Sequence, residues 1–138
     1  KSFGGRHVQI PTAINLLKAQ DWSPFGEKVD SSFVSSFTIP YGTVVHIDNF
    51  GLSKIKAPAL NQLLPGDKLK LTIHGKSEHE IFYTQSLKQE KDNTPVLFEG
   101  SSLYGLPEIG IVRHPNSAKA FGVEVGDRLT WEKIPCQP

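Results

Sequence analysis

The sequence lacks methionine entirely and contains a single cysteine, Cys136, among its 138 residues. One cysteine cannot form a disulfide within the chain, and scarce cysteine is typical of a reducing compartment, so we expect a cytoplasmic protein. Because translation starts at methionine, we expect Lys1 to lie inside a longer parent chain. Cleavage of a signal peptide is the other explanation of the missing methionine.

Long apolar runs and a surplus of one charge are also absent. No apolar stretch approaches the roughly 18 residues that a membrane helix needs. The 15 basic and 14 acidic residues give a formal net charge of +1, whereas nucleic-acid-binding modules usually carry a clustered basic surplus. We therefore expect no membrane and no nucleic acid among the partners of this chain, which is long enough for one domain with a core.

The common motifs of metal and catalytic sites do not occur in this sequence. There is no H-E-x-x-H, no Cys/His cluster and no glycine-rich phosphate loop, and Gly100-Ser101-Ser102 is not a G-x-S-x-G nucleophile motif. His74 and His79 flank residues 75–78, and solvated residues of a hairpin turn are a better interpretation than metal ligands. We expect no metal, and the residues by themselves identify no catalytic group.

The hydrophobic pattern predicts one helix followed by strands. Residues 11–19 predict a helix, because Pro11 suits a first turn and Ile10, Ile14 and Leu17 share one face. From Ser31 onward the period is two, which is typical of half-buried strands. Strands are expected within residues 31–39, 44–47, 68–74, 81–83, 96–98, 109–112 and 128–131.

Turn signals complete this picture. Residues 116–122 predict a short helical turn with Asn116 as its N-cap and Gly122 as its C-cap. The stretches 66–71 and 126–131 both read Gly-Asp-basic-Leu, which indicates that one turn design is used twice. We expect a mainly β fold, a small antiparallel β-barrel with an N-terminal linker helix and one short helical turn. Residues 1–30 would be the linker helix and connector, and residues 31–135 the barrel.

Aromatic side chains are expected to fill the core of the barrel. The candidates are Phe33, Phe37, Phe50, Phe82 and Phe98.

The stretch Asp48-Asn49-Phe50-Gly51 directly follows a predicted strand. An aspartate and an asparagine at a strand end are typical of an Asx-type turn. A carboxylate, an amide and an aromatic ring together would also suit a small-molecule pocket, and the residues alone leave both interpretations open.

Residues 42–51 resemble the G-x-V-x-x-I-D-x-F-G-N segment of the S-adenosyl-L-methionine (SAM) hydroxide adenosyltransferases, relatives of the SAM-dependent fluorinases and chlorinases. Residues 98–102 resemble the L-x-G-S-S segment of that family, residues 109–118 its L-x-I-A-x-N-x-x-S-A segment, and residues 121–127 its L-G-L-x-x-G-D segment. Residues 2–13 resemble its T-F-H-G-R-D-x-F-A-P-x-A stretch. The resemblance covers nearly the whole chain, but only the C-terminal half of the family's architecture.

The resemblance implies a function for a longer parent protein. In this family water, hydroxide or halide attacks C5′ of the SAM ribose and methionine leaves, and the N-terminal domain supplies most catalytic groups. The C-terminal barrel holds adenine and methionine, typically across a trimer interface. The parent would convert SAM and water to adenosine and L-methionine as a homotrimer, with SAM as substrate and no cofactor, and this chain would not be catalytic alone.

The resemblance also implies a set of substrate-binding residues. Asp48 would contact the methionine amino group, Ser101 or Ser102 the methionine carboxylate, and the backbone of residues 113–115 the adenine edge. A solvated loop before the cap at Asn116 is the alternative interpretation of residues 113–115. The implied set is Asp48, Phe50, Leu52, Ser101, Ser102, Arg113, His114 and Pro115.

Departures from the family pattern leave the enzymatic activity open. Leu52 stands where the family has the adenine-binding asparagine, and losing such a hydrogen bond costs about 1–3 kcal/mol. Gly4 aligns with the catalytic histidine, His7 with the aspartate of the same motif, and the catalytic aspartate and arginine would lie upstream of Lys1. The alternative is a non-catalytic relative whose barrel serves oligomerisation or binds another ligand or a protein partner.

Overall fold

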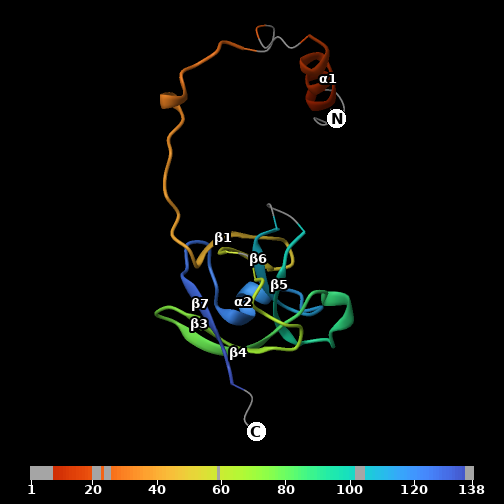
Figure 1. Cartoon of the computed structure of the whole chain (residues 1–138), viewed down its shortest axis with the longest axis vertical. Coiled ribbons are helices and arrows are strands. Elements are labelled where there is room, and N and C mark those ends of the chain that lie inside the picture. Colours follow the sequence, from red (N-terminus) through yellow and green to blue (C-terminus); the bar gives the residue numbers. More distant parts are fainter. Residues whose placement is uncertain (1–7, 20–22, 24–25, 59, 102–104, 136–138) are drawn as a thin grey trace. The chain divides into compact units, whose positions relative to one another are not determined.

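The computed structural model describes residues 8–19, 23, 26–58, 60–101 and 105–135 (Figure 1). The chain divides into two compact units, Lys1–Phe37 and Thr38–Pro138. The division falls after Phe37, whereas the sequence pattern starts the barrel at Ser31.

The first unit contains the helix α1, Ile10–Ala19, and the 3-10 turn η3, Ser31–Phe33. The predicted helix is thereby confirmed. The strand predicted within residues 31–39 is wrong, because after η3 the chain runs to Pro40 without strand pairing. Phe33 and Phe37 are 80% and 82% exposed, so neither belongs to a core. Alternating apolar residues form a strand only beside a neighbour that pairs with the backbone and covers one face.

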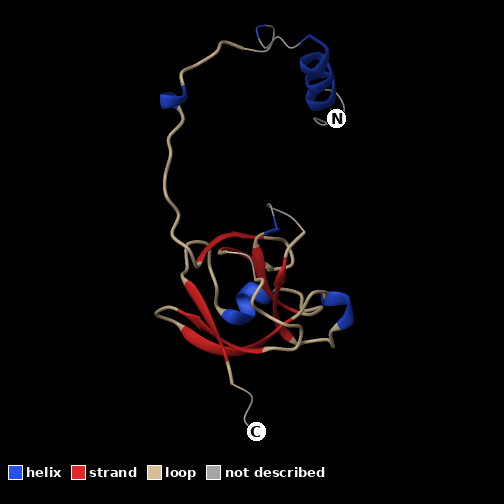
Figure 2. Ribbon diagram, in the orientation of Figure 1, coloured by secondary structure: helices blue, strands red, loops and turns tan. Residues whose placement is uncertain are grey.

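The second unit is a curled seven-stranded sheet (Figure 2). Its order is β1-β2-β6-β5-β4-β3-β7. The elements are β1 Thr43–Ile47, β2 Ser53–Lys56, β3 Lys68–Ile73, β4 Ser77–Tyr83, η4 Leu87–Gln89, β5 Pro95–Glu99, β6 Pro107–Ile111, α2 Ser117–Phe121 and β7 Leu129–Lys133.

The two end strands of this sheet meet. Thr43 of β1 forms an antiparallel bridge with Arg128, just before β7. The backbone N–H of Val44 donates to Asp127 O at 2.9 Å, and that of Leu129 donates to Gly42 O at 2.8 Å. The mainly β class and the barrel-like sheet predicted from the sequence are confirmed. The sheet is not wholly antiparallel, because β4 and β5 pair in parallel.

Strand β2 was not predicted from the sequence. Its four residues, Ser-Lys-Ile-Lys, contain two lysines, and three of the four are buried. Ile55 faces the main core, whereas Lys54 is buried on the other face of the strand. The fully buried large side chains of the core come from all seven strands: Val44, Ile55, Leu69, Leu71, Ile73, Ile81, Leu97, Ile109 and Leu129.

The predicted aromatic core is only partly correct. Phe98 is buried with Val96 and Val112 in a smaller apolar cluster, against which the half-buried Leu52 and Leu87 pack. Phe50, in contrast, is 69% exposed, so its predicted place in the core is wrong.

Helix α2 has both of its predicted caps. The side chain of Asn116 accepts a hydrogen bond from the Lys119 N–H at 3.0 Å, and Gly122 takes the left-handed conformation at φ 72°. Ser117 ties the helix to the end of β6, because its Oγ accepts from the Ile111 N–H at 2.8 Å. The loop before α2 is therefore held to the sheet by hydrogen bonds.

The repeated Gly-Asp turn is confirmed. Asp67 accepts a hydrogen bond from the Leu64 N–H at 2.9 Å, and Asp127 accepts one from the Glu124 N–H at 2.8 Å. Each aspartate also donates its own backbone N–H to the same partner, at 2.9 and 3.1 Å. Gly66 precedes the first aspartate with a φ of +90°, a conformation that favours glycine.

Across the part of the chain that the structure describes, no helix has both the length and the apolar character needed to cross a bilayer.

Candidate functional site

Asp48 closes the turn between β1 and β2. Its Oδ1 accepts hydrogen bonds from the Phe50 N–H at 2.9 Å and the Leu52 N–H at 3.0 Å. Backbone bonds from Gly51 N to Asp48 O and from Asp48 N to Leu52 O complete the turn. The Asx-type interpretation is therefore confirmed for Oδ1, while contact between Asp48 and a ligand stays a prediction.

The second carboxylate oxygen of Asp48 faces a buried ion pair. Its Oδ2 lies 3.8 Å from the Lys54 Nζ, and that ammonium lies 2.8 Å from the Glu108 Oε1. Lys54 and Glu108 are paired residues of the adjacent strands β2 and β6. We call Asp48, Lys54 and Glu108 the charged cluster.

Gly100 makes room for the deepest member of the charged cluster. A Cβ atom at Gly100 would overlap the carboxylate of Glu108, so the chain leaves β5 with its backbone directly against that side chain. Ser101, the next residue, is exposed. Ser102 lies outside the described residues, as do Gly4 and His7.

The turn at Asp48 packs against the start of α2. The backbone N–H of Ser117 donates to Phe50 O at 3.3 Å. A Cβ atom at Gly51 would lie 2.6 Å from the Asn116 Oδ1, so only glycine fits at this contact. Two segments of the implied binding set, residues 48–52 and the loop that leads into α2, are therefore neighbours.

Within that loop the side chains have partners of their own. The guanidinium of Arg113 hydrogen-bonds with Asp92 and donates to Glu90 O at 3.2 Å. Arg113 has a φ of 52°, which is uncommon outside glycine. His114 accepts a hydrogen bond at its Nδ1 from the Asn116 N–H at 3.2 Å, and Pro115 is exposed. A role of their backbone toward adenine stays a prediction.

The side chain of Leu52 takes part in apolar packing. Its Cδ2 lies over Gly110, where an added Cβ would overlap it. Leu52 is half-buried and belongs to the edge of the smaller apolar cluster. Its side chain has no polar atom, so this position offers a ligand apolar contact alone.

Lys54 and Glu108 were not predicted as site residues from the sequence. A signal for Glu108 exists, because it is a lone carboxylate in the otherwise uncharged stretch Pro107–Ile111. A charge inside a buried strand requires an opposite charge nearby. The partner could not be chosen from the sequence, since Lys54 and Lys56 both lie in β2.

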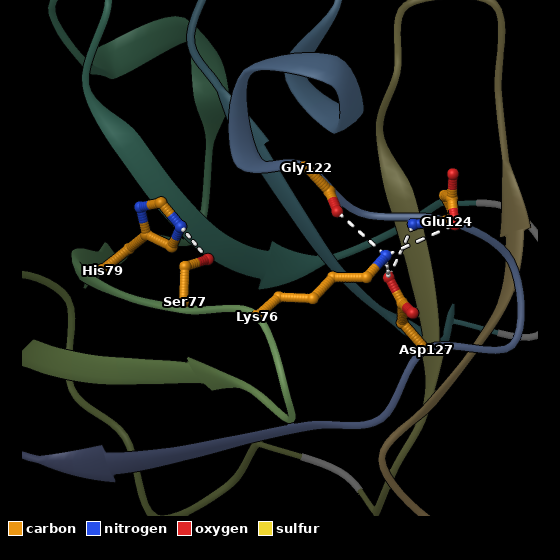
Figure 3. A network of polar contacts seen from close by, with 6 residues as sticks. All are labelled: Lys76, Ser77, His79, Gly122, Glu124 and Asp127. Carbon is orange, nitrogen blue, oxygen red and sulfur yellow. Dashed lines mark hydrogen bonds and ion pairs between the residues drawn. The ribbon is translucent and has the colours of Figure 1, made fainter.

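A second polar network ties the β3–β4 hairpin to the segment after α2 (Figure 3). The Lys76 Nζ lies 2.8 Å from the Asp127 Oδ2 and 3.3 Å from the Glu124 Oε2, and it donates to Gly122 O at 3.2 Å. The hydrogen bond to Asp127 is the main cause of a raised pKa at Lys76. A hollow of about 390 Å³ borders this network, lined by Ile47, Asn116, Ala118, Lys119, Gly122, Val123 and Glu124.

The histidines of the same hairpin have local partners. His79 Nε2 lies 2.8 Å from the Ser77 Oγ, and its ring meets that of Phe121 edge-on at 5.1 Å between centroids. His74 Nε2 lies 3.2 Å from the Thr130 Oγ1. Among the described residues, no group of three or more metal-ligating side chains could hold a metal ion.

Comparison with known proteins gives the fold of this chain. An uncharacterised conserved protein of Thermotoga maritima matches over 95% of this chain and 52% of its own length, with a TM-score of 0.68 and 19% identity. A conserved hypothetical protein of Thermus thermophilus matches over 95% of this chain and 53% of its own length, with a TM-score of 0.60 and 20% identity. No family model and no curated protein matches the chain. The chain thus spans about half the length of these two solved structures.

Proposed function

We propose that this chain is the C-terminal substrate-binding barrel of a SAM hydroxide adenosyltransferase-like protein. The parent protein would convert SAM and water to adenosine and L-methionine, as a cytoplasmic homotrimer that uses SAM as its substrate and needs no cofactor. The barrel would bind and orient the nucleoside, and the other half of the parent would position the attacking water or halide.

One observation carries the proposal. The turn of residues 48–52 lies against the start of α2, with Ser117 N donating to Phe50 O at 3.3 Å and no space for a side chain at Gly51. These are two of the sequence segments that resemble the family. Segments that are distant in sequence but meet at one end of a sheet are the usual way to build a nucleoside site.

The length of the structural relatives is a second support. The Thermotoga and Thermus proteins are about twice as long as this chain, since it covers 52% and 53% of them. A parent with another domain would have comparable length. At 19% and 20% identity these relatives inform the fold alone, and the substrate is inferred from the sequence motifs.

A binding measurement tests the proposal directly. Isothermal titration calorimetry would measure adenosine, SAM and, as a control nucleoside, uridine, first on this chain and then on the full-length parent. We expect adenosine to bind and uridine not to bind. The proposal is wrong if neither adenosine nor SAM binds the full-length parent in the low millimolar range.

A second candidate function has its own observation. The ammonium of Lys54 already lies beside Asp48, and Leu52 is occupied in packing over Gly110. Both features favour a non-catalytic relative whose barrel serves oligomerisation or another ligand. Two measurements on the full-length parent separate these functions: turnover of SAM, and the mass by sedimentation. A trimer that releases methionine supports the enzyme. A trimer without turnover supports the non-catalytic relative.

A further inference from the structure

A hollow of about 420 Å³ is lined by Pro58, Leu60, Gln62, Leu63, Trp131 and Lys133. We call it the Trp131 hollow. The turn at Asp48 precedes β2 and the segment 58–63 follows that strand, so the hollow and the candidate site lie at opposite ends of β2. Its volume is in the range of small-molecule sites, which often occupy the mouths of β-barrels.

The apolar wall of the Trp131 hollow belongs to the main core. Leu129, Trp131 and Lys133 alternate along β7 and therefore point to the same face of the sheet. Leu129 is buried in the core, and the half-buried Trp131 packs against it. Leu60 is 5% exposed, and Leu63 packs against the same core. The core therefore holds the indole ring and both leucines in place around the hollow.

Two polar side chains complete the lining. The ammonium of Lys133 pairs with the Asp67 Oδ1 at 2.7 Å, and the Asp67 Oδ2 accepts a hydrogen bond from the Leu64 N–H at 2.9 Å. This pairing fixes the position of Lys133 and balances its charge. An ammonium has three N–H donors, so Lys133 can donate to a ligand while it stays paired with Asp67. The amide of the exposed Gln62 can both donate and accept.

We propose that the Trp131 hollow binds a neutral, planar aromatic ring that carries a carbonyl group. The ring packs against the indole of Trp131, and aromatic pairs gain stability beyond the area that they bury. The carbonyl oxygen accepts a hydrogen bond from the ammonium of Lys133 or the amide of Gln62. The adenine ring of SAM has no carbonyl, so this ligand class differs from the one proposed for the other end of β2.

The charges beside the hollow disfavour an anion. A ligand carboxylate would be attracted by the ammonium of Lys133, but it would also be repelled by the nearby carboxylate of Asp67. It would in addition lose part of its hydration beside the apolar wall. A neutral carbonyl keeps the hydrogen bond to Lys133 and incurs neither cost.

Three small molecules test the proposal. Benzamide has the planar ring and the carbonyl, benzoate replaces the amide with a carboxylate, and cyclohexanecarboxamide keeps the amide on a ring that is not aromatic. Each is titrated into the ¹⁵N-labelled chain, and the indole N–H cross-peak of Trp131, assigned with a Trp22→Phe variant, reports binding. We expect benzamide to bind with a Kd of roughly 1 mM, and the other two to bind at least about fivefold more weakly.

Variants of the lining identify the contacts. Trp131→Leu should weaken benzamide binding about tenfold, as followed by the backbone cross-peak of Leu63. Lys133→Met should weaken it about threefold and provides the measurement if the loss of the indole ring prevents folding. Lys68→Met is the matched control, because Lys68 and Lys133 are 51% and 49% exposed and each pairs with one carboxylate. Lys68 does not line the hollow, so its variant should bind benzamide like the wild type.

A change of charge gives the sharpest test. Asp67→Asn leaves the ammonium of Lys133 without its carboxylate partner, so benzoate should then bind at least as tightly as benzamide. Loss of packing alone would not reverse the preference between two ligands of the same shape.

Several results would overturn the proposal. These are the absence of benzamide binding in the low millimolar range, equal binding of cyclohexanecarboxamide, and tighter binding of benzoate than of benzamide by the wild type. An equal loss of affinity in the Lys68 and Lys133 variants would also contradict it. So would an unchanged preference for benzamide in Asp67→Asn.

Discussion

Asp67 and Asp127 hold equivalent positions in two copies of one turn, and each is bound by a lysine at the far end of the opposite strand. Asp67 pairs with Lys133 of β7 at 2.7 Å, and Asp127 pairs with Lys76 beyond β3 at 2.8 Å. The exchange follows from the antiparallel pairing of β3 with β7, which brings the start of each strand to the end of the other. Each aspartate therefore links the start of one of these two strands to the end of the other.

The ion pairs of Asp67 and Asp127 predict that the stability of the fold depends on pH. The hydrogen bond from the Leu64 N–H, with that from Lys133, holds the pKa of Asp67 below its ordinary value of 3.8. Burial raises the pKa of Asp127, but hydrogen bonds from Lys76 and the Glu124 N–H outweigh burial and lower it. A lowered folded-state pKa stabilises the protein above the unfolded pKa of about 3.9, and this stabilisation is lost as the pH falls through the folded value.

Replacement of either aspartate removes this dependence. Asp67→Asn and Asp127→Asn should each lower the free energy of unfolding at pH 7, and the difference from wild type should shrink below about pH 4. Urea unfolding between pH 2 and pH 7 provides the measurement. A difference that stays constant over that range would show that the carboxylate charges do not contribute.

The buried ion pair predicts strong non-additivity. Glu108→Leu alone leaves the ammonium of Lys54 buried without its partner at 2.8 Å and should reduce the unfolding free energy by about 3–5 kcal/mol. Adding Lys54→Met should recover most of that loss, since an apolar pair of similar volume is often neutral. Chemical denaturation of the single and double variants gives the coupling energy, and simple additivity would contradict the prediction.

Substitution of exposed phenylalanines should change the unfolding free energy far less than substitution of a buried one. Phe33→Ser with Phe37→Ser should leave the unfolding free energy of the barrel within about 0.5 kcal/mol, because both side chains are more than three-quarters exposed. Phe98→Ala, in the smaller apolar cluster, should cost about 3 kcal/mol. Urea denaturation compares the two variants, and a large loss in the Phe33/Phe37 variant would place these rings in a core.

Leu52 predicts a gain of binding, on the basis of the proposed function. Leu52→Asn restores the hydrogen-bonding side chain that the family carries at this position and should tighten adenosine binding about tenfold, a gain of ~1.4 kcal/mol. Leu63→Asn is the matched control, because Leu63 is likewise a half-buried leucine that packs against a core cluster. Both variants should lose stability, but only Leu52→Asn should change the calorimetric affinity.

Features that depend on neighbouring residues could be predicted from the sequence, whereas features that depend on residues far apart in the chain could not. Local features such as helix α1, the caps of α2 and both Gly-Asp turns were predicted, because neighbouring residues determine them. Strand β2 was missed, since burying Lys54 depends on Glu108, a residue far along the chain. The strand expected within residues 31–39 was wrong for the converse reason: its local pattern suits a strand, but no described strand pairs with it.

The same division applies to the candidate site. The turn at Asp48 and the cap at Asn116 are local and were predicted, whereas the contact of Phe50 with Ser117 and the cluster behind Asp48 are products of the fold. Alternation of apolar residues indicates which face of a strand is buried. This alternation does not indicate which charged residue will be buried in the same strand.

The bridge between Thr43 and Arg128 has a consequence for biosynthesis. Every strand from β1 to β6 leaves the ribosome before the residues that close the sheet. Until Arg128 and β7 emerge, the nascent barrel has an open seam that exposes its apolar interior, and such exposed surface is prone to aggregation.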